Sequence, residues 1–429
     1  MFFYILFGGD ILAIIIKNIS NLVTCKSEGK KTGKDLANAN VIQNGYVVID
    51  KDLIKAVGEG ETYKEFENEG DIIIDGQGKT VTPGLIDSHT HVVHSGSREN
   101  ELPMKLNKVS YIEILKSGGG ILSTVRNTRN ADFHTLVEEA KKRLDTMLLH
   151  GTTTIESKSG YALNLNDEVK MLEVNKKLNE IHPVDVVSTY LGAHAIPEEY
   201  KQDREGYINL MINEVIPYVA KNHLAGYIDC FCEHGVYTVE ETEKILLEGM
   251  KYGMKAKLHA DEVEPMGGAE LAGKIKAVSA EHLVAASEEG MKAMAESGVV
   301  AVLLPSTSFY LMLKRFAEAR KMIEYGVPIA LATDCNPGTS PTESLQAVMT
   351  FACFGMGLLP EEIINAMTIN AAYAIGRENQ VGSIEVGKKA DIAIFNSKNL
   401  NYLIYHFGVN AIDKVIKSGK IVVENGKIV

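Results

Sequence analysis

The sequence has no tryptophan and few cysteines, and these scarcities already narrow the class of protein. Its cysteines include no Cys-x-x-Cys pair and no dense spacing of the kind found in disulfide frameworks. The five are Cys25, Cys230, Cys232, Cys335 and Cys353. A sparse, odd-numbered set is typical of reduced thiols, so we expect a cytoplasmic protein. Low-complexity tracts are also missing, and 45% hydrophobic with 23% charged residues is the balance of an ordinary globular chain.

An excess of basic residues is missing as well. The 429 residues carry 44 Lys and Arg against 56 Asp and Glu, which gives a formal net charge of -12. This balance argues against nucleic acid or an anionic membrane as a partner. If the substrate is a small anionic molecule, its pocket has to be locally basic.

No long uninterrupted hydrophobic run occurs, although the N-terminus comes close to one. Gly8, Gly9 and Asp10 break the run, and no Lys or Arg precedes Lys17. A signal peptide would begin with positive charge, and a membrane helix would need about 20 consecutive apolar residues. The β-branched stretch ILAIII that follows Asp10 therefore predicts a buried strand. The first eight residues are expected to be a disordered extension.

Strand and helix patterns alternate through the middle of the chain. Apolar, β-rich runs recur there with amphipathic segments such as DEVKMLEVNKKLNEI and TVEETEKILLEGMKYG between them. The runs are LIDSHTH, TTTIESKSGY, VDVVSTYLGAHAI, GYIDCFCEHGV, MKAKLHADE, IKAVSAEHL, VVAVLLPS and VPIALATDCNPG. Eight strand–helix units of this size predict an α/β fold with a (β/α)8 TIM-like barrel over residues 83–380.

Both ends of the chain contain short strand-like segments instead of helices. Residues 1–82 and 381–429 are each too short to bury a core of their own. We therefore predict that they combine into one small β-sandwich domain beside the barrel.

Polar side chains end several of the predicted barrel strands, where catalytic residues of such barrels lie. His89 and His91 end the first strand and, at a spacing of two, project to the same side. His259 ends the fifth strand, His282 the sixth, and Asp334 the eighth. Three or four imidazoles with a carboxylate suit Zn2+ or a similar first-row metal. A single histidine would more often be structural, but a set at four strand ends indicates a metal site.

The motifs around these residues resemble a known family. VTPGLIDSHTH together with GSIEVGKKADIAIF is similar to the amidohydrolase superfamily of metal-dependent barrels with a split β-sandwich. Within it, the chain resembles the imidazolonepropionase family in the flanking motifs HTHVVHSGSREN, SGGGILSTVRNTR, TTTIESKSGYALN, YLGAHAIPEEY, KLHADE and TDCNPGTS. The resemblance extends over essentially the whole chain.

The resemblance implies a role for each matching position. One Zn2+ or Fe3+ ion per subunit would be bound by His89, His91, His259 and Asp334. Substrate contacts would be made by Arg98, Tyr161, His194, Glu262, His282, Asn336, Gly338 and Thr339. The catalytic groups would be Glu262, His282 and Asp334, with Glu262 moving protons at a ring nitrogen.

The implied reaction is the hydrolytic ring opening of 4-imidazolone-5-propanoate to N-formimidoyl-L-glutamate in histidine degradation. Its anionic propionate explains why an acidic protein needs a basic pocket. Arg98 directly follows the metal-binding strand and offers a bidentate fork for a carboxylate. We expect Thr339 and the backbone N–H groups of the NPGT loop to add donors. A homodimer is expected from the resemblance.

Four other features are weaker candidates. His94 lies outside the strand period and departs from the bulky apolar residue expected there, so it is interpreted as a supporting or surface residue. Lys158 ends the second strand, where it is displaced from the place of a bridging lysine, so one metal is favoured over two. SGGGI, residues 117–121, is expected to be a mobile loop, with Arg126 and Arg129 on a solvated helix face. Cys230, Cys232, Glu233 and His234 are interpreted as barrel packing and support.

Two alternatives remain open from the sequence. A related amidohydrolase that acts on another cyclic amide, or that deaminates a ring, would keep the metal set and change the surroundings of Arg98, Tyr161 and His194. A non-catalytic scaffold would be expected to have lost ligands. The intact set of His89, His91, His259 and Asp334 argues against the scaffold.

Overall fold

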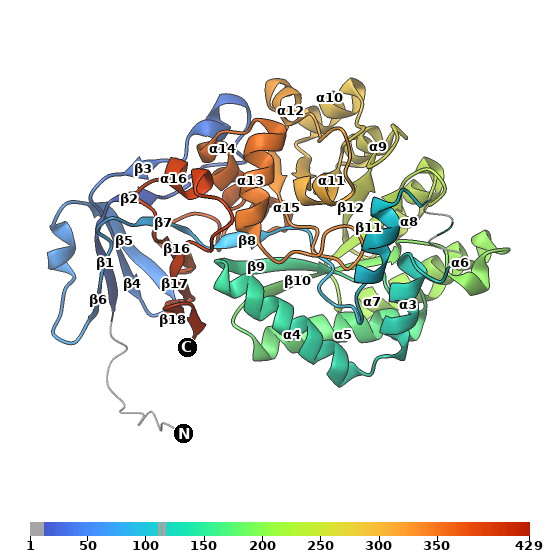
Figure 1. The fold of residues 1–429 in the computed structure, drawn as a ribbon, viewed down its shortest axis with the longest axis horizontal. Helices are drawn as coiled ribbons and strands as arrows, with labels where there is room; N and C mark the ends of the chain where they lie inside the picture. The colour runs from blue at the N-terminus through green and yellow to red at the C-terminus, as the bar shows by residue number, and fades with distance from the viewer. Residues whose placement is uncertain (1–12, 110–112, 114–116) are drawn as a thin grey trace.

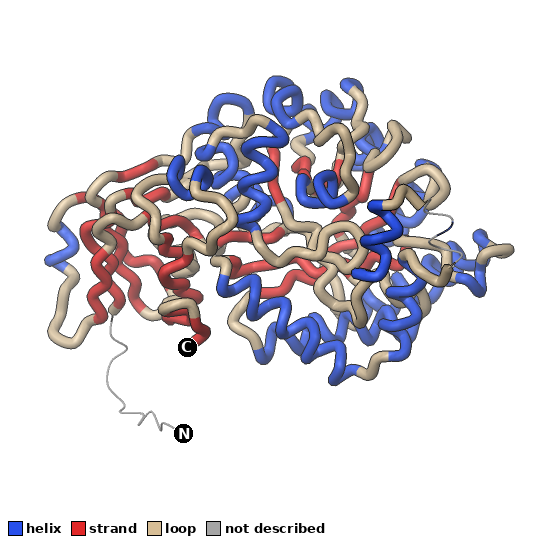
Figure 2. Tube along the Cα trace, viewed as in Figure 1, coloured by secondary structure: helices blue, strands red, loops and turns tan. Residues whose placement is uncertain are grey.

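The computed structural model describes residues 13–109, 113 and 117–429, so the expectation about the first eight residues lies outside it. A barrel surrounded by helices makes up one end of the molecule, and a group of strands makes up the other (Figure 1). Figure 2 shows the strands of the barrel enclosed by helices, whereas the second group carries few helices.

The barrel consists of eight parallel strands that follow the order of the chain. Hydrogen bonds join neighbouring strands from the first to the eighth in sequence. They are β8 (Leu85–Asp87), β9 (Thr152–Lys158), β10 (Asp185–Ala193), β11 (Tyr227–Cys232), β12 (Lys255–Ala260), β13 (Ser279–His282), β14 (Val300–Leu303) and β15 (Ile329–Leu331). Each lies within one of the eight predicted runs, and the predicted fold class is confirmed.

The first and last strands meet through the residues that follow them. The backbone N–H of His91 donates to the carbonyl of Cys335 at 2.9 Å, and that of Asp334 donates to His89 at 3.0 Å. Asp87 is fully buried and accepts from the backbone N–H and the hydroxyl of Thr333, at 3.0 and 2.6 Å. Burial raises the pKa of the Asp87 carboxyl to about 7. We call these contacts, centred on Asp87 and Thr333, the seam of the barrel. They hold the end of β8 against the end of β15.

Thr333→Val is expected to weaken the seam. The hydroxyl of Thr333 also accepts from the backbone N–H of Cys335 at 3.0 Å, so valine leaves two buried polar groups without this partner. An unsatisfied buried group costs about 1–3 kcal/mol, and we expect the free energy of unfolding to fall by about 2 kcal/mol or more. Urea denaturation of the metal-free protein measures this loss.

Thr153→Val is the matched control for that substitution. Thr153 is equally buried in the barrel, but its hydroxyl has no hydrogen-bond partner among the described residues. It should lose less than about 0.5 kcal/mol. Equal losses in the two variants would show that the Asp87–Thr333 contact does not hold the seam.

Helices pack around the barrel and begin at recognisable caps. Asn164 caps α5 by accepting from the backbone N–H of Asp167, and Thr238 and Glu241 form a capping box at α8. Both helices cover the segments predicted to be amphipathic. The helices are α1 (Leu102–Leu106), α3 (Ile121–Asn130), α4 (Phe133–Leu149), α5 (Leu165–Ile181), α6 (Arg204–Leu210), α7 (Ile216–Lys221), α8 (Val239–Lys251), α9 (Gly268–Ile275), α10 (Glu288–Ser297), α11 (Pro305–Tyr310), α12 (Ala319–Tyr325), α13 (Leu345–Met356), α14 (Pro360–Ala366), α15 (Ile369–Ala374) and α16 (Leu400–Tyr405).

Two further sheets form the small β domain. The four-stranded sheet contains β1 (Ile14–Ile19), β4 (Gly45–Asp50), β5 (Leu53–Glu59) and β6 (Ile72–Asp75). The seven-stranded sheet contains β2 (Asn21–Val23), β3 (Val41–Ile42), β7 (Thr80–Pro83), β16 (Ile392–Phe395), β17 (Ile412–Lys417), β18 (Lys420–Glu424) and β19 (Lys427–Ile428). Isoleucines and valines from both sheets pack into one core.

The two ends of the chain are joined directly by a strand pair. β7 pairs antiparallel with β16, so that Thr80 lies opposite Phe395 and Pro83 opposite Ile392. The strand predicted before Lys17 is present as β1, in which Ile15 and Ile16 are fully buried. A β domain built from both chain ends is therefore confirmed, while the exact boundaries at 82 and 381 stay predictions.

No helix in the described part of the chain is long and apolar enough to cross a membrane.

Candidate metal centre and active site

Three ligand-type atoms converge at the carboxyl end of the barrel. The Nε2 atoms of His89 and His91 lie 3.3 Å apart, and Asp334 Oδ1 lies 3.3 and 3.5 Å from them. All three residues follow β8 or β15, so the barrel seam sets their separation. His259, at the end of β12, joins them with its ring centre 4.6 Å from that of His89.

These residues fit a metal ion. Ligand atoms around a tetrahedral ion with bonds of about 2.0–2.1 Å lie about 3.3–3.4 Å apart, which matches the three observed separations. His259 Nε2 is buried and has no hydrogen-bond partner among the described residues, as expected for an atom that awaits an ion. The sequence-predicted ligands fall into two groups that share His89 and could each hold a metal ion: His89 with His91 and His259, and His89 with His282 and Asp334.

His282, which the sequence placed in the same set of strand-end residues, also lies beside this cluster. Its ring nitrogen is within 4.8 Å of ligand atoms on both His89 and Asp334. It is the last residue of β13, the strand next to β12 in the barrel, and it is 4% exposed. His282 can therefore act beside the ion, and its role as a substrate or catalytic group stays a prediction.

Burial determines the charge of the imidazoles. It lowers the pKa of His89, His91 and His282 well below the usual value, so these rings are neutral and their lone pairs can bind a cation. Burial is also the largest effect on His259 and acts to lower its pKa, but the charge and hydrogen bond of Asp229 together with the charge of Glu281 leave this pKa above its usual value. Burial raises the pKa of Asp334 to about 6.

The backbone is strained where the site residues leave their strands. His282 has φ 69° and Asp334 has φ 54°, in the left-handed region that L-residues rarely adopt. Such strain persists only where the surroundings enforce it, and it concentrates at functional sites.

Aromatic side chains form one wall of the site. The His194 ring stacks on His91 with centres 5.1 Å apart and planes inclined by 15°. Tyr161 lies 5.6 Å from His91 and 5.2 Å from His194, measured between ring centres. Burial lowers the pKa of His194 to about 3, which keeps this ring neutral. Aromatic rings of this kind can stack on a flat heterocycle.

Glu262 supplies an acidic group two residues beyond the end of β12. Its Oε2 lies 3.7 Å from His282 Nε2. Burial, with a smaller contribution from Asp334, raises the pKa of Glu262 to about 8. A carboxyl group that is protonated near neutral pH can donate a proton, as a general acid must.

Arg98 lies close to Gly338 of the NPGT loop, but its guanidinium group is paired differently from the sequence-based expectation. Its Nε and Nη2 both bind Glu101, at 2.8 Å to each carboxylate oxygen, so the bidentate face is already paired within the chain. Nη1 points toward Gly338, where a Cβ would lie only 2.1 Å away and would displace the guanidinium. Glu101 was not predicted from the sequence. Its position three residues after Arg98 was the available indication of an ion pair between the two side chains.

The NPGT loop also needs a correction. The backbone N–H groups of Gly338 and Thr339 donate to Asn336 Oδ1, at 2.8 and 2.7 Å, and so are used inside the loop. Asn336 Nδ2 in turn donates to the carbonyl of Asp334 and to the Thr339 hydroxyl. The loop therefore forms a closed turn of Asn336, Gly338 and Thr339 that holds Asp334 in place. The expectation was that these backbone N–H groups would be available to the substrate.

The weaker candidates are also placed. His94 is buried, with Nδ1 3.3 Å from Nη2 of Arg143, away from the ligand cluster. Arg129 donates to the carbonyls of Ala162 and Leu163 and pairs with Glu199, so it is less solvated than predicted. Glu233, in the predicted supporting group, accepts from the backbone N–H groups of His234 and Val263.

Comparison with known proteins decides the family. A model of the amidohydrolase family matches residues 80–422. The chain belongs to the amidohydrolase family. Its relatives include proteins named imidazolonepropionase from Alkaliphilus oremlandii and Treponema denticola, which are 55% and 54% identical to it. Each alignment covers 96% of this chain and, respectively, 99% and 98% of the relative. The family predicted from the sequence, including its imidazolonepropionase branch, is confirmed.

Solved structures support the fold of this amidohydrolase. Triazine hydrolase from Arthobacter aurescens superposes with a TM-score of 0.72 at 17% identity, covering 98% of this chain and 96% of that one. An adenosine deaminase from Xanthomonas campestris gives 0.69 at 17% identity, covering 98% and 95%. At such identities the likeness establishes the architecture alone.

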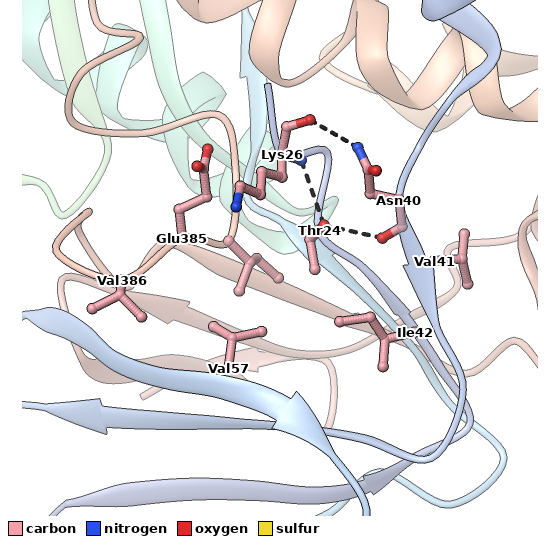
Figure 3. Close-up of a pocket in the computed structure, with 9 residues that line it drawn as sticks. Thr24, Lys26, Asn40, Val41, Ile42, Val57, Glu385 and Val386 are labelled. Carbon is pink, nitrogen blue, oxygen red and sulfur yellow. Dashed lines mark hydrogen bonds between the residues drawn. The ribbon is translucent and has the colours of Figure 1, made fainter. Parts of the chain in front are cut away.

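A cavity of about 580 Å3 lies in the β domain and contains none of these site residues (Figure 3). Three of its lining residues are linked by hydrogen bonds: Thr24 donates to the carbonyl of Asn40, whose side chain donates to the carbonyl of Lys26. Val41 and Val386 line its rim and are exposed. These contacts hold the segment between β2 and β3.

Proposed function

We propose that this amidohydrolase is an imidazolonepropionase, which opens the ring of 4-imidazolone-5-propanoate by hydrolysis to give N-formimidoyl-L-glutamate. The observation that carries the proposal is the identity of 50–55% to relatives of that name over nearly the whole chain. The clustered ligands and the aromatic wall agree with it, because they suit metal-assisted attack on a flat heterocycle.

The metal is one Zn2+ or Fe3+ ion per subunit in this proposal. His89, His91, His259 and Asp334 would hold it, with His282 adjacent. Such an ion lowers the pKa of water toward about 7 and polarises the carbonyl under attack.

The chain's own side chains handle binding and protons. His194 and Tyr161 would hold the ring against His91, with its carbonyl facing the ligand cluster. The oxygen of water adds to the ring carbonyl carbon, the C–N bond breaks, and the freed ring nitrogen takes a proton. Glu262 is the donor of that proton, and Asp334 with His282 accepts the proton that water loses.

The propionate would bind beside Arg98. Arg98, Glu101 and Lys105 together carry one net positive charge, and Lys105 Nζ reaches the carbonyl of Gly338 at 2.7 Å. This arrangement supplies the local basic character that an acidic protein needs for an anionic substrate. Glu101 fixes the guanidinium, so an incoming carboxylate meets it in one orientation.

Arg98→Ala is expected to raise KM for the propionate-bearing substrate by about 10- to 100-fold, since a charge-assisted hydrogen bond contributes about 1.5–3 kcal/mol. KM for an imidazolone without the tail should change little. Steady-state kinetics on both substrates measure the difference, and an equal increase for both would assign Arg98 a purely structural role.

The function itself is tested with freshly made 4-imidazolone-5-propanoate. The metal-loaded enzyme should remove its ultraviolet absorbance and release N-formimidoyl-L-glutamate. Turnover of other cyclic amides or ring amines, without turnover of this substrate, would favour a related amidohydrolase instead.

The cellular location, the partners and the oligomeric state of the enzyme are also proposals. We propose a cytoplasmic enzyme whose partner is a small anionic substrate and which does not act on nucleic acid or membranes, in keeping with a net charge of -12. We propose a homodimer as well, supported by the exposed Phe354, Tyr405 and Phe407. Light scattering of the purified enzyme tests the assembly.

A further inference from the structure

Five charged side chains lie inside the barrel, next to the ligand cluster. Glu156 and Lys158 come from β9, Asp229 from β11, Lys257 from β12 and Glu281 from β13, and each is 0% exposed. Barrel interiors of this kind are normally filled by branched apolar residues. A buried charged layer breaks that rule, and such departures are expected where function requires them.

The five side chains form one ion-pair network. Lys158 Nζ lies 2.9 Å from Glu156, 2.8 Å from Asp229 and 2.8 Å from Glu281. Lys257 Nζ lies 2.8 Å from Glu156 and 3.2 Å from Glu281. Three carboxylates face two ammonium groups, so the network carries one net negative charge.

The network reaches the metal ligands through two of its carboxylates. Glu281 Oε2 contacts Nδ1 of His89, and Asp229 Oδ2 lies 2.9 Å from Nδ1 of His259. Asp229 Oδ1 also accepts from the backbone N–H of His259 at 3.1 Å. An imidazole whose Nδ1–H faces a carboxylate presents the lone pair of Nε2 on its other side.

The ligand atoms converge on the Nε2 side of these imidazole rings. His89 Nε2 faces His91 Nε2 and Asp334 Oδ1 at 3.3 Å, and His259 Nε2 has no hydrogen-bond partner among the described residues. The single negative charge of the network and that of Asp334 together equal the charge of a divalent cation. The network and Asp334 thus place two negative charges beside the atoms that would bind the ion.

We propose that Glu281 and Asp229 are positioning residues that fix His89 and His259 in the orientation and tautomer that bind the ion, and that Lys158 and Lys257 hold these carboxylates in place. The inference rests on the metal site of the proposed function and is independent of the substrate. It also gives Lys158 a role as a fixed internal cation instead of a bridging ligand.

The test is the affinity of the metal-stripped protein for Zn2+, measured by competition with a chelator. Glu281→Gln and Asp229→Asn keep the size of each side chain and remove its charge. Each is expected to weaken Zn2+ binding by about 10- to 100-fold, the range for groups that orient a ligand. The two variants act on different imidazoles, so either one decides the question if the other does not fold.

Asp391→Asn is the matched control. Asp391 is a buried carboxylate that pairs with Lys417 at 2.5 Å in the β domain, with no contact to a metal ligand among its described partners. This variant should unfold more easily in urea and yet bind Zn2+ within about threefold of the parent. The proposal is overturned if the folded Glu281 and Asp229 variants keep parental affinity, or if the control loses as much as they do. Failure to turn over the substrate, with these affinities as expected, would contradict only the proposed function.

Discussion

Glu262→Gln is expected to lower kcat by a factor of about 10² to 10⁴, the usual contribution of a general acid or base. Glutamine keeps the shape of the side chain but cannot donate and recover a proton as a carboxyl group does. Glu262 is suited to this task because burial raises its pKa to about 8, and because it lies 3.7 Å from His282. KM should change less than about tenfold, since most of the ring contacts come from other residues.

Kinetics with 4-imidazolone-5-propanoate and a metal determination on the same sample measure this effect. The metal content should equal that of the parent, because Glu262 is not among the clustered ligands. A variant with full metal content and a kcat within threefold of the parent would remove Glu262 from the mechanism.

Removal of the metal is expected to abolish turnover, with a loss on the order of 10³-fold or more, because a Lewis acid contributes several kcal/mol to the transition state. Adding Zn2+ or an iron salt back to the stripped enzyme should restore activity. The ion that restores the larger share at one equivalent per subunit identifies the more effective metal.

The same titration has a second readout that does not depend on activity. An ion that binds only the folded state at 1,000 times its Kd raises the free energy of unfolding by about 4 kcal/mol. Thermal unfolding of the stripped protein should therefore shift upward as Zn2+ is added. His259→Ala should abolish most of the shift, and a shift of parental size in that variant would place the metal elsewhere.

The sequence predicted the barrel well because local patterns and hydrophobic periodicity carry that information. Each apolar run contains one strand, and capping residues such as Asn164 and Thr238 start the helices where the amphipathic pattern begins. Strand-like sequence patterns predicted strands less reliably near the C-terminus. VGSIEVGKKADIAIF contributes only Ile392–Phe395 as a strand, since glycines and lysines hold the preceding segment in turns.

The site was predicted unevenly, for a physical reason. His89 and His91 could be paired from their spacing of two, and strand-end positions added His259, His282 and Asp334. Only the family resemblance implied that His282 is not one of the ligands. The partners of Arg98 could not be obtained in this way. An arginine next to a glutamate suggests either a surface pair or a substrate clamp, and only the coordinates show that Glu101 binds both Nε and Nη2.

The sequence by itself therefore determined the barrel, the joined chain ends, the family and which residues gather at the candidate metal site. Only the tertiary structure decided what surrounds them: the Asp87–Thr333 seam, the closed turn of Asn336, and the layer formed by Glu156, Lys158, Asp229, Lys257 and Glu281. Strand periodicity specifies which side chains face inward, and it is a local property. Which inward-facing charges meet depends on the register between strands that are far apart in the chain, and that register is set only when the barrel closes.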